Sequence, residues 1–355
     1  MTNRIYKNYL NIKHVSFLFF FASLLLATGF SQNDPKAQLE KAEQYYKSAQ
    51  FDEAIGILIK LSADNSNLEI QKESLRFLGR AYTAKGLYDK AKESIMKLLE
   101  LEPPIVEFNP DYEPPVFMKL YYESRKEYSG SYEVERPDPG MKAMAIIDFK
   151  NRSVDKKLQY DPMEKGFADL MIHRMNNSTQ LKVIERERIQ WILDEIKLQD
   201  QYDMEGAVRL GKQLGVQTVL LGSFIIVNDQ IWLGTRLVKV ETSEILLTDE
   251  VKGELDEFFD LVDKLSEKVA EKINVSLKED TTAEVSEAPS LDAIMSYSMG
   301  LSFLEKEDYK NAYDKFQEAL KFDPNYEKAK LKAQSIAPLL KTNFSLLFFG
   351  KRCFH

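Results

Sequence analysis

The chain has 355 residues, enough for two or three domains, and 44% of them are apolar, so it can bury several hydrophobic cores. Its formal net charge of −8 disfavours binding to the phosphate backbone of nucleic acids. The single cysteine, Cys353, excludes an internal disulfide. With only three histidines beside it, the sequence offers no conventional zinc cluster.

Residues 1–31 have the composition of a secretory signal peptide. A basic segment precedes an apolar run at residues 15–30, and small residues follow at Gly29 and Ser31. The run is shorter than the roughly 18 residues of a spanning helix, so we expect cleavage there rather than a retained anchor. Phe30 stands where a bacterial lipoprotein would need cysteine. We therefore predict an exported, periplasmic protein whose association with the outer membrane is at most peripheral.

Residues 36–103 have the apolar spacing of two tetratricopeptide-like helix hairpins, the second matching more clearly than the first. Small residues in the second hairpin let two antiparallel helices approach closely, and aromatic residues fill the seam between them. A proline after the hairpin is expected to end its second helix. The residues assigned to this packing are Leu78, Gly79, Tyr82, Gly86, Tyr88, Ala91 and Pro103.

Residues 104–140 are rich in proline and aromatic residues and are predicted to connect the repeats to the next domain. An amphipathic helix is expected at residues 116–127, where it would cap the repeats. Residues 128–140 have the composition of a linker.

The pattern of residues 141–275 predicts helices packed on a mixed sheet, an α/β sandwich. Strands are expected at residues 144–149 and 181–186, followed by helices. Two further strands meet at a hairpin turn, Asn228-Asp229. Asp161 is expected to cap the first helix of this domain.

Three motifs in this region carry a resemblance to a known family. They are the strand that ends in Asp148-Phe149-Lys150-Asn151, the segment at residues 183–198, and the run at residues 210–223. Together they resemble the CsgG-like curli production assembly and transport family. The resemblance implies a periplasm-side α/β domain that often assembles into rings. The related fold also occurs in lipoproteins that activate peptidoglycan synthases.

The chain departs from the curli pores in two respects. It lacks the cysteine that anchors those lipoproteins, and residues 150–160 are too short and too polar for a long membrane-inserting hairpin. We therefore expect the soluble domain of the family without its pore.

Residues 291–336 are predicted to form a third tetratricopeptide unit with a capping helix. The residues assigned to its packing are Gly300, Phe303, Tyr309, Ala312, Phe316, Ala319 and Pro324. An acidic, flexible linker is expected before it at residues 276–290, and a poorly ordered tail after it at residues 337–355. The overall fold class is thus a central mixed-sheet domain with all-helical units on both sides.

The sequence contains no recognisable catalytic set, so we predict no catalytic residue, no metal site and no cofactor. His173 has no second histidine or cysteine near it in the sequence and is expected at the surface. Asp148, Glu185 and Arg186 are candidates for an interaction or structural role. The charged run at residues 185–188 fits either an ion-pair cluster at a binding site or, preferentially, a solvated helix start.

These features favour a non-enzymatic scaffold of the bacterial envelope that uses a repeat groove and a CsgG-like domain to bind protein partners during assembly or secretion. It could also associate with copies of itself. One alternative is a ring-forming outer-membrane component of the curli type. Another is a regulator that activates a peptidoglycan synthase.

Overall fold

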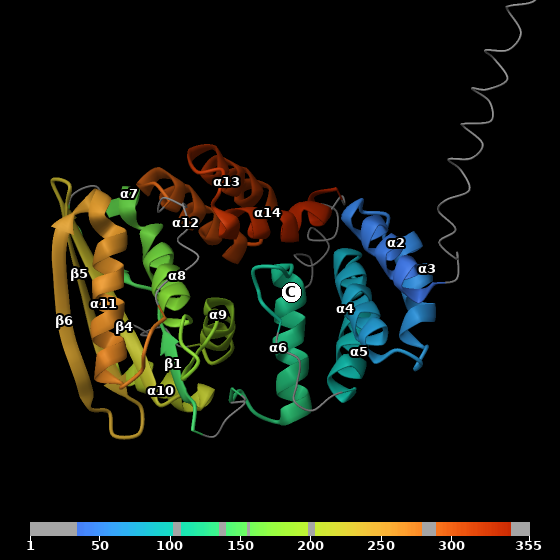
Figure 1. The fold of residues 1–355 in the computed structure, drawn as a ribbon, viewed down its shortest axis with the longest axis horizontal. Helices are drawn as coiled ribbons and strands as arrows, with labels where there is room; N and C mark the ends of the chain where they lie inside the picture. Colours follow the sequence, from blue (N-terminus) through green and yellow to red (C-terminus); the bar gives the residue numbers. More distant parts are fainter. Residues whose placement is uncertain are drawn as a thin grey trace, which may run out of the picture.

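The computed structural model describes residues 34–101, 108–134, 140–154, 157–197, 203–278 and 289–341. The predicted signal peptide at residues 1–31 and the predictions for Pro103 and Cys353 lie outside these ranges. Two helical arms and a sheet domain make up the described chain (Figure 1).

The N-terminal arm consists of five helices. They are α2 (Pro35–Lys47), α3 (Phe51–Ser62), α4 (Leu68–Ala84), α5 (Tyr88–Glu100) and α6 (Pro115–Ser129). Each of these helices packs against the next one along the chain, from α2 through to α6. Asn67 caps α4 by accepting a hydrogen bond from the amide of Ile70 at 3.2 Å. The helix expected at residues 116–127 lies within α6.

The C-terminal arm consists of α12 (Leu291–Glu305), α13 (Tyr309–Phe322) and α14 (Glu327–Leu340). Residues 337–340, the start of the predicted tail, belong to α14, and residues 342–355 lie outside the described chain. The three helix hairpins share one backbone feature: a residue with positive φ stands two positions before the aromatic residue that opens the second helix. These pairs are Ala49 and Phe51, Gly86 and Tyr88, and Glu307 and Tyr309.

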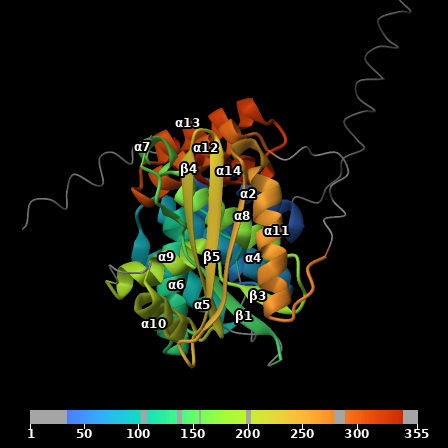
Figure 2. The same cartoon turned by 90° about the vertical axis from the view of Figure 1, so that its left-hand side faces the viewer.

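The chain between the two arms forms a six-stranded sheet in the order β3-β1-β4-β5-β6, with β2 beside β4. Its strands are β1 (Lys142–Ile146), β2 (Lys150–Asn151), β3 (Leu181–Val183), β4 (Thr218–Val227), β5 (Gln230–Lys239) and β6 (Ile245–Glu254). The pairs among β1 to β4 are parallel, and β4-β5 and β5-β6 are antiparallel, so the predicted mixed sheet is confirmed. The long antiparallel strands face the viewer in Figure 2.

Helices pack on both faces of the sheet, but on one face the cover is partial, since Ile225 and Val227 of β4 are exposed. The helices of this domain are α7 (Lys157–Tyr160), α8 (Met163–Met175), α9 (Arg186–Glu195), α10 (Met204–Leu214) and α11 (Phe258–Lys272), the last preceded by the 3₁₀ turn η1 (Leu255–Glu257). On one face, Phe167 of α8 packs 4.9 Å from Phe224 of β4 and 6.3 Å from Phe258 of α11, between ring centroids. On the other face, α10 approaches Val219, whose side chain points opposite to that of Leu220.

Local sequence signals explain most of these boundaries. Gly215, with φ of 67°, ends α10 in the left-handed conformation, as expected of a C-cap glycine. Asn228 and Asp229 both have positive φ and form the predicted hairpin turn between β4 and β5. The prediction for Asp161 is wrong, because Pro162 occupies the N-cap position of α8. The carboxylate of Asp161 instead accepts a hydrogen bond from Asn151 Nδ2 at 3.0 Å.

Close helix contact attaches the C-terminal arm to the sheet domain. Helix α12 packs on α8, and a Cβ atom at Gly166 would lie 2.3 Å from Ser298 Oγ. Within the arm, a Cβ atom at Gly300 would lie 2.4 Å from Phe316 Cε1. A side chain at either glycine would therefore have to displace Ser298 or Phe316, or move the two helices apart.

Among the described residues, no helix combines the length and the apolar character needed to cross a bilayer.

Candidate interaction site

A buried ion-pair cluster joins the sheet domain to the C-terminal arm. Arg186, the first residue of α9, is 6% exposed and donates from Nε and Nη2 to the two carboxylate oxygens of Asp148, both at 2.7 Å. Arg186 Nη2 also donates to Glu305 at the end of α12. Lys165 of α8 approaches the same carboxylates, at 2.7 Å from Glu305 and 3.7 Å from Asp148.

Two neighbouring carboxylates fix the charge of Arg186. Burial alone would lower the pKa of its guanidinium, but the charges of Asp148 and Glu305 outweigh burial and raise that pKa well above its usual value. The bidentate geometry with Asp148 adds orientation to charge pairing. Arg186 is therefore a permanent cation that links the end of β1 to the end of α12.

A second cluster joins α14 to α9 and to the segment before α6. Lys332 of α14 is 3% exposed and lies 2.5 Å from Glu187 Oε1 and 3.1 Å from Asp111 Oδ1. Burial acts to lower the pKa of Lys332, but these two carboxylates raise it above the ordinary lysine value. Lys328, one turn earlier, lies 2.7 Å from Asp169 of α8.

The third connection runs through the segment that follows α6. Arg188 of α9 is buried and donates from Nη2 to the carbonyl oxygens of Tyr132 and Glu133, each at 3.0 Å. The amide of Val134 donates to the carbonyl of Leu214 at 3.0 Å. This part of the predicted linker at residues 128–140 is thus attached to the sheet domain rather than free.

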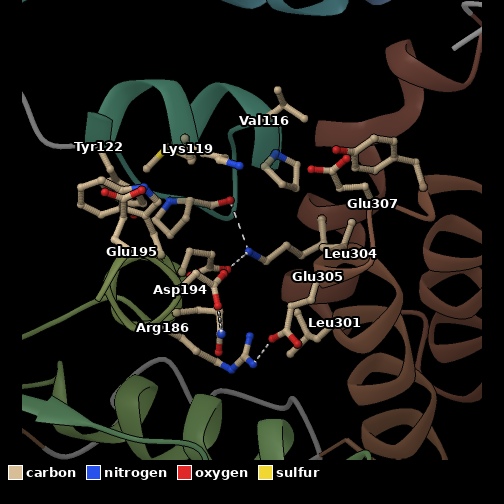
Figure 3. Close-up of a pocket in the computed structure, with 18 residues that line it drawn as sticks. Val116, Lys119, Tyr122, Arg186, Asp194, Glu195, Leu301, Leu304, Glu305 and Glu307 are labelled. Carbon is tan, nitrogen blue, oxygen red and sulfur yellow. Dashed lines mark hydrogen bonds and ion pairs between the residues drawn. The ribbon is translucent and has the colours of Figure 1, made fainter. Parts of the chain in front are cut away.

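The junction of these three parts encloses a pocket of about 250 Å³ between α6, α9 and the C-terminal arm (Figure 3). We call it the junction pocket. Its apolar lining includes Val116 and Tyr122 from α6, Trp191 from α9, and Leu301 and Leu304 from α12. Its charged lining consists of Lys119, Arg186, Glu187, Asp194, Glu195, Glu305, Glu307 and Lys332.

Two polar groups in the pocket wall are buried without a partner in the described structure. They are the hydroxyl of Tyr122 and the indole Nε1 of Trp191, whose side chains are 4% and 8% exposed. The two rings pack together at 5.6 Å between centroids, and Tyr132 packs on the indole from the other side at 5.5 Å. Both groups can donate a hydrogen bond, but neither atom is accessible to solvent, so neither donor opens into the pocket.

The N-terminal arm has two further hollows. One, of about 280 Å³, lies between α2, α4 and α14, so α14 covers that side of the repeats. The other, of about 520 Å³, lies over α3, α4 and α5 and is lined in part by Ile59 and Tyr82. Helix α14 therefore lies beside one side of the predicted repeat groove, whereas the described residues that line the other side all belong to the N-terminal arm.

Of the three charged candidates, Asp148, Glu185 and Arg186, the structure brings Asp148 and Arg186 together. Glu185 lies apart from them, with its carboxylate 3.9 Å from Lys182 Nζ. The preferred interpretation of residues 185–188 as a solvated helix start is wrong, because Arg186 and Arg188 are buried. Similarly, the predicted linker at residues 276–290 begins with attached residues, since Lys278 donates its amide to Asn177 at 2.8 Å.

The residues assigned to repeat packing lie mostly in the cores of the hairpins. In the N-terminal arm, Gly79 faces Phe117 of α6. A Cβ atom at Gly79 would lie 2.7 Å from the Phe117 ring and 3.4 Å from Ile95 of α5. Half-buried or exposed positions are Tyr82, Gly86, Tyr88, Phe303 and Pro324, and buried positions are Leu78, Ala91, Gly300, Tyr309, Ala312, Phe316 and Ala319.

His173 is exposed at the end of α8. Within the described ranges, no group of three or more histidine, cysteine, aspartate or glutamate side chains could hold a metal ion.

Sequence reasoning missed Glu305, Lys332, Asp111 and Trp191 as members of this site. Glu305 is 119 positions from Arg186, and Lys332 is 145 positions from Glu187. Charged residues at such separations carry no local pattern, so only the fold reveals that they meet.

The fold and the site define a sheet domain that is joined through buried charges to helical repeats on both sides. Residues 131–231 match the family model of the curli production assembly/transport component CsgG, and residues 73–104 match a tetratricopeptide repeat. The expected CsgG-like domain and tetratricopeptide repeat are thus both confirmed. The repeat match covers the second hairpin of the N-terminal arm.

Several solved structures are similar to part of the chain. The LpoB C-terminal domain from Escherichia coli is 14% identical, with 34% of this chain and 87% of that chain covered and a TM-score of 0.26. Lipoprotein GNA1162 from Neisseria meningitidis is 15% identical, with 38% and 99% covered and a TM-score of 0.27. At these TM-scores neither similarity supports a functional assignment. Comparison with curated proteins gives no match.

Proposed function

We propose that this chain is an exported protein-interaction scaffold of the bacterial cell envelope and has no catalytic activity. A tetratricopeptide repeat and a CsgG-like domain in one chain favour binding over catalysis. The CsgG family match and the signal-like composition of residues 1–31 support the envelope location.

The observation that carries the proposal is the junction. Arg186 and Lys332 are buried cations that connect the sheet domain to the C-terminal arm, and Lys332 also reaches the segment before α6. Buried ion pairs of this kind fix a relative orientation more than they add stability. We therefore propose that the two arms and the sheet domain present one composite surface to a partner.

Partner capture in the cells that naturally carry the protein tests this function. The full chain with a C-terminal affinity tag should recover an envelope protein in near-equimolar amount after reversible crosslinking. The double variant Arg186→Met/Lys332→Met should lose that protein, whereas the surface variant Lys310→Met should keep it. Recovery of the tagged chain alone, or its presence in the cytosol with residues 1–31 uncleaved, would contradict the proposal.

A mass measurement separates this scaffold from the ring-forming alternative. In our proposal the purified mature chain is a monomer or a small oligomer in solution. A closed assembly of many copies would favour the curli-type ring instead.

A further inference from the structure

The last strand of the sheet, β6, has a free outer edge. The sheet ends in β3 on one side and in β6 on the other. Strand β3 has three residues, whereas β6 has ten, and no described strand pairs with its outer side. Figure 1 shows β6 at the side of the molecule that is farthest from α2 and α3. A long free edge presents unpaired amide and carbonyl groups on which the strand of another chain can pair.

The backbone groups on this edge belong to the even-numbered residues of β6. The amide of Leu255 donates to the carbonyl of Asp229 at 2.7 Å, and the register with β5 is regular over Leu247–Glu254. Odd-numbered residues of β6 therefore direct their amides toward β5, and even-numbered ones direct theirs outward. Consistently, the amide of Glu250 donates to the side chain of its neighbour Asp249 at 2.8 Å.

Two exposed charges of opposite sign stand side by side on this edge. Glu250 and Lys252 are exposed and lie on the face of the sheet that carries Trp232, with Lys252 Nζ 4.6 Å from the centroid of that indole. Among the residues that the structure describes, neither Glu250 nor Lys252 forms an ion pair. A row of like charges keeps sheet edges apart. A glutamate followed two positions later by a lysine is instead complementary to a second copy of itself.

Hydrogen-bond direction limits how two copies of β6 can pair as antiparallel strands around a two-fold axis. An even-numbered residue must face an even-numbered one, so the axis passes through a residue rather than between two. An axis at Glu250 or at Lys252 places that charge opposite itself, which is unfavourable. An axis at Asp249 pairs neither charge with its opposite.

An axis at Val251 is the favourable register. It places Glu250 of each copy opposite Lys252 of the other, which gives two ion pairs, and it pairs residues 248–254 of both strands. An axis at Gly253 would pair Lys252 with Glu254 but would overlap only residues 252–254 of each strand. Opposite charges and a long overlap thus coincide in the Val251 register.

We propose that two copies of the chain join by antiparallel pairing of their β6 strands around Val251, so that their sheets become one continuous sheet. This inference goes beyond the proposed function, because it needs no envelope partner. The same edge serves both copies, so the assembly closes at two. One strand pair is a small interface, and we therefore expect a reversible dimer whose population rises with concentration.

Sedimentation equilibrium of the mature chain measures this dimer, with Cys353→Ser to remove the thiol that could link two copies. Glu250→Lys and Lys252→Glu should each weaken the dimer by about tenfold, because each turns both ion pairs into like-charge pairs. The double variant Glu250→Lys/Lys252→Glu should restore most of the dimer, since both pairs form again with their signs exchanged. The matched control Glu244→Lys, at the exposed turn before β6, should leave the dimer unchanged.

A cysteine at the axis tests the register itself. Opposed residues that are not hydrogen-bonded to each other have Cα atoms about 4.5 Å apart, within reach of a disulfide. In the Cys353→Ser background, Val251→Cys should therefore form a disulfide between copies under mild oxidation. Leu247→Cys lies on the same face and is similarly half-buried, but it has no copy of itself opposite and should stay reduced.

Four results would overturn the proposal. The first is a chain that stays monomeric at its highest soluble concentration, and the second is a closed assembly of many copies. The third is a dimer that neither single substitution weakens, or that the double variant fails to restore. The fourth is crosslinking through Leu247→Cys rather than Val251→Cys.

Failure of the dimer differs from failure of the proposed function. A monomeric chain that still captures an envelope partner contradicts the dimer alone. A chain that dimerises through β6 but captures no partner contradicts the scaffold alone. In distance measurements between spin labels, an excess of unlabelled chain keeps distances within one copy separate from those between copies.

Discussion

At the scale of single residues, the structure depends on cations buried among carboxylates from distant parts of the chain. Arg186 contacts Asp148 and Glu305, and each of these carboxylates would lose its closest cation if Arg186 were removed. Lys165 would remain near both but cannot reproduce the bidentate contact. The cost of breaking such a buried pair exceeds its net contribution, because it leaves a desolvated charge behind.

We therefore predict that Arg186→Met lowers the free energy of unfolding by about 3 kcal/mol, at the lower end for a broken buried pair because Glu305 retains solvent contact. The matched control is Lys310→Met, which breaks the exposed pair with Asp314 and should cost under about 1 kcal/mol. Urea unfolding monitored by circular dichroism measures both. Equal effects of the two substitutions would show that the junction cation has no special role.

Acid should weaken the second cluster. Burial raises the pKa of Asp111, but Lys332 and Lys328 outweigh burial and bring that pKa below its usual value of 3.8. On acidification the unfolded chain therefore binds this proton first. The stabilisation by Asp111 is fully present above the unfolded pKa and is lost as pH falls through the lower folded pKa.

The substitution Asp111→Asn isolates this effect. The difference in unfolding free energy between the wild type and the variant should be larger at about pH 5 than at about pH 3. In a Lys332→Met background the dependence on pH should decrease, because the cation that lowers the pKa is gone. A difference that is the same at both pH values would contradict the assigned pairing.

At the scale of helices and strands, glycine positions determine how closely elements approach. Gly300 faces Phe316 within its hairpin, whereas a Cβ atom added at Gly56, in the middle of α3, would meet no neighbouring atom within 4 Å. The same substitution should thus have opposite effects at these two sites. Gly300→Ala should destabilise the chain by about 1–3 kcal/mol through overpacking. Gly56→Ala should stabilise it by about 0.5–1 kcal/mol through helix propensity.

Thermal and urea unfolding of the two full-length variants checks this pair. The expectation fails if Gly300→Ala is neutral, or if both substitutions shift stability in the same direction. The result bears on the C-terminal hairpin, whose repeat pattern is recognised from the sequence and not from a family match.

Many elements can be predicted from local sequence, and the reasons are physical. The turn at Asn228-Asp229 and the C-cap at Gly215 are encoded by residues that tolerate positive φ. The cap predicted at Asp161 is wrong because a short helix, α7, immediately precedes α8, and no local pattern indicates that helix. The length of β2 is likewise below what alternation of apolar residues can indicate.

At the scale of the whole molecule, the sequence indicates three regions but not how they are joined. Asp148 and Arg186 can be singled out as charged residues beside predicted elements. Their third partner, Glu305, lies beyond a predicted linker, so the sequence favours independent units. The junction pocket is equally hidden, since its lining comes from α6, α9, α12 and α14. Chain connectivity gives no signal for contacts of this kind, which depend on tertiary packing.

The central claim is that both helical arms and the sheet domain act as one binding unit. Double electron–electron resonance tests it most directly, with Cys353 replaced by serine and spin labels at exposed Glu53 of α3 and Glu241 beside β5. We predict a single narrow distance distribution for the wild-type background that broadens in Arg186→Met/Lys332→Met. A broad or multiple distribution before those substitutions would contradict the claim, because the arm and the sheet would then move independently.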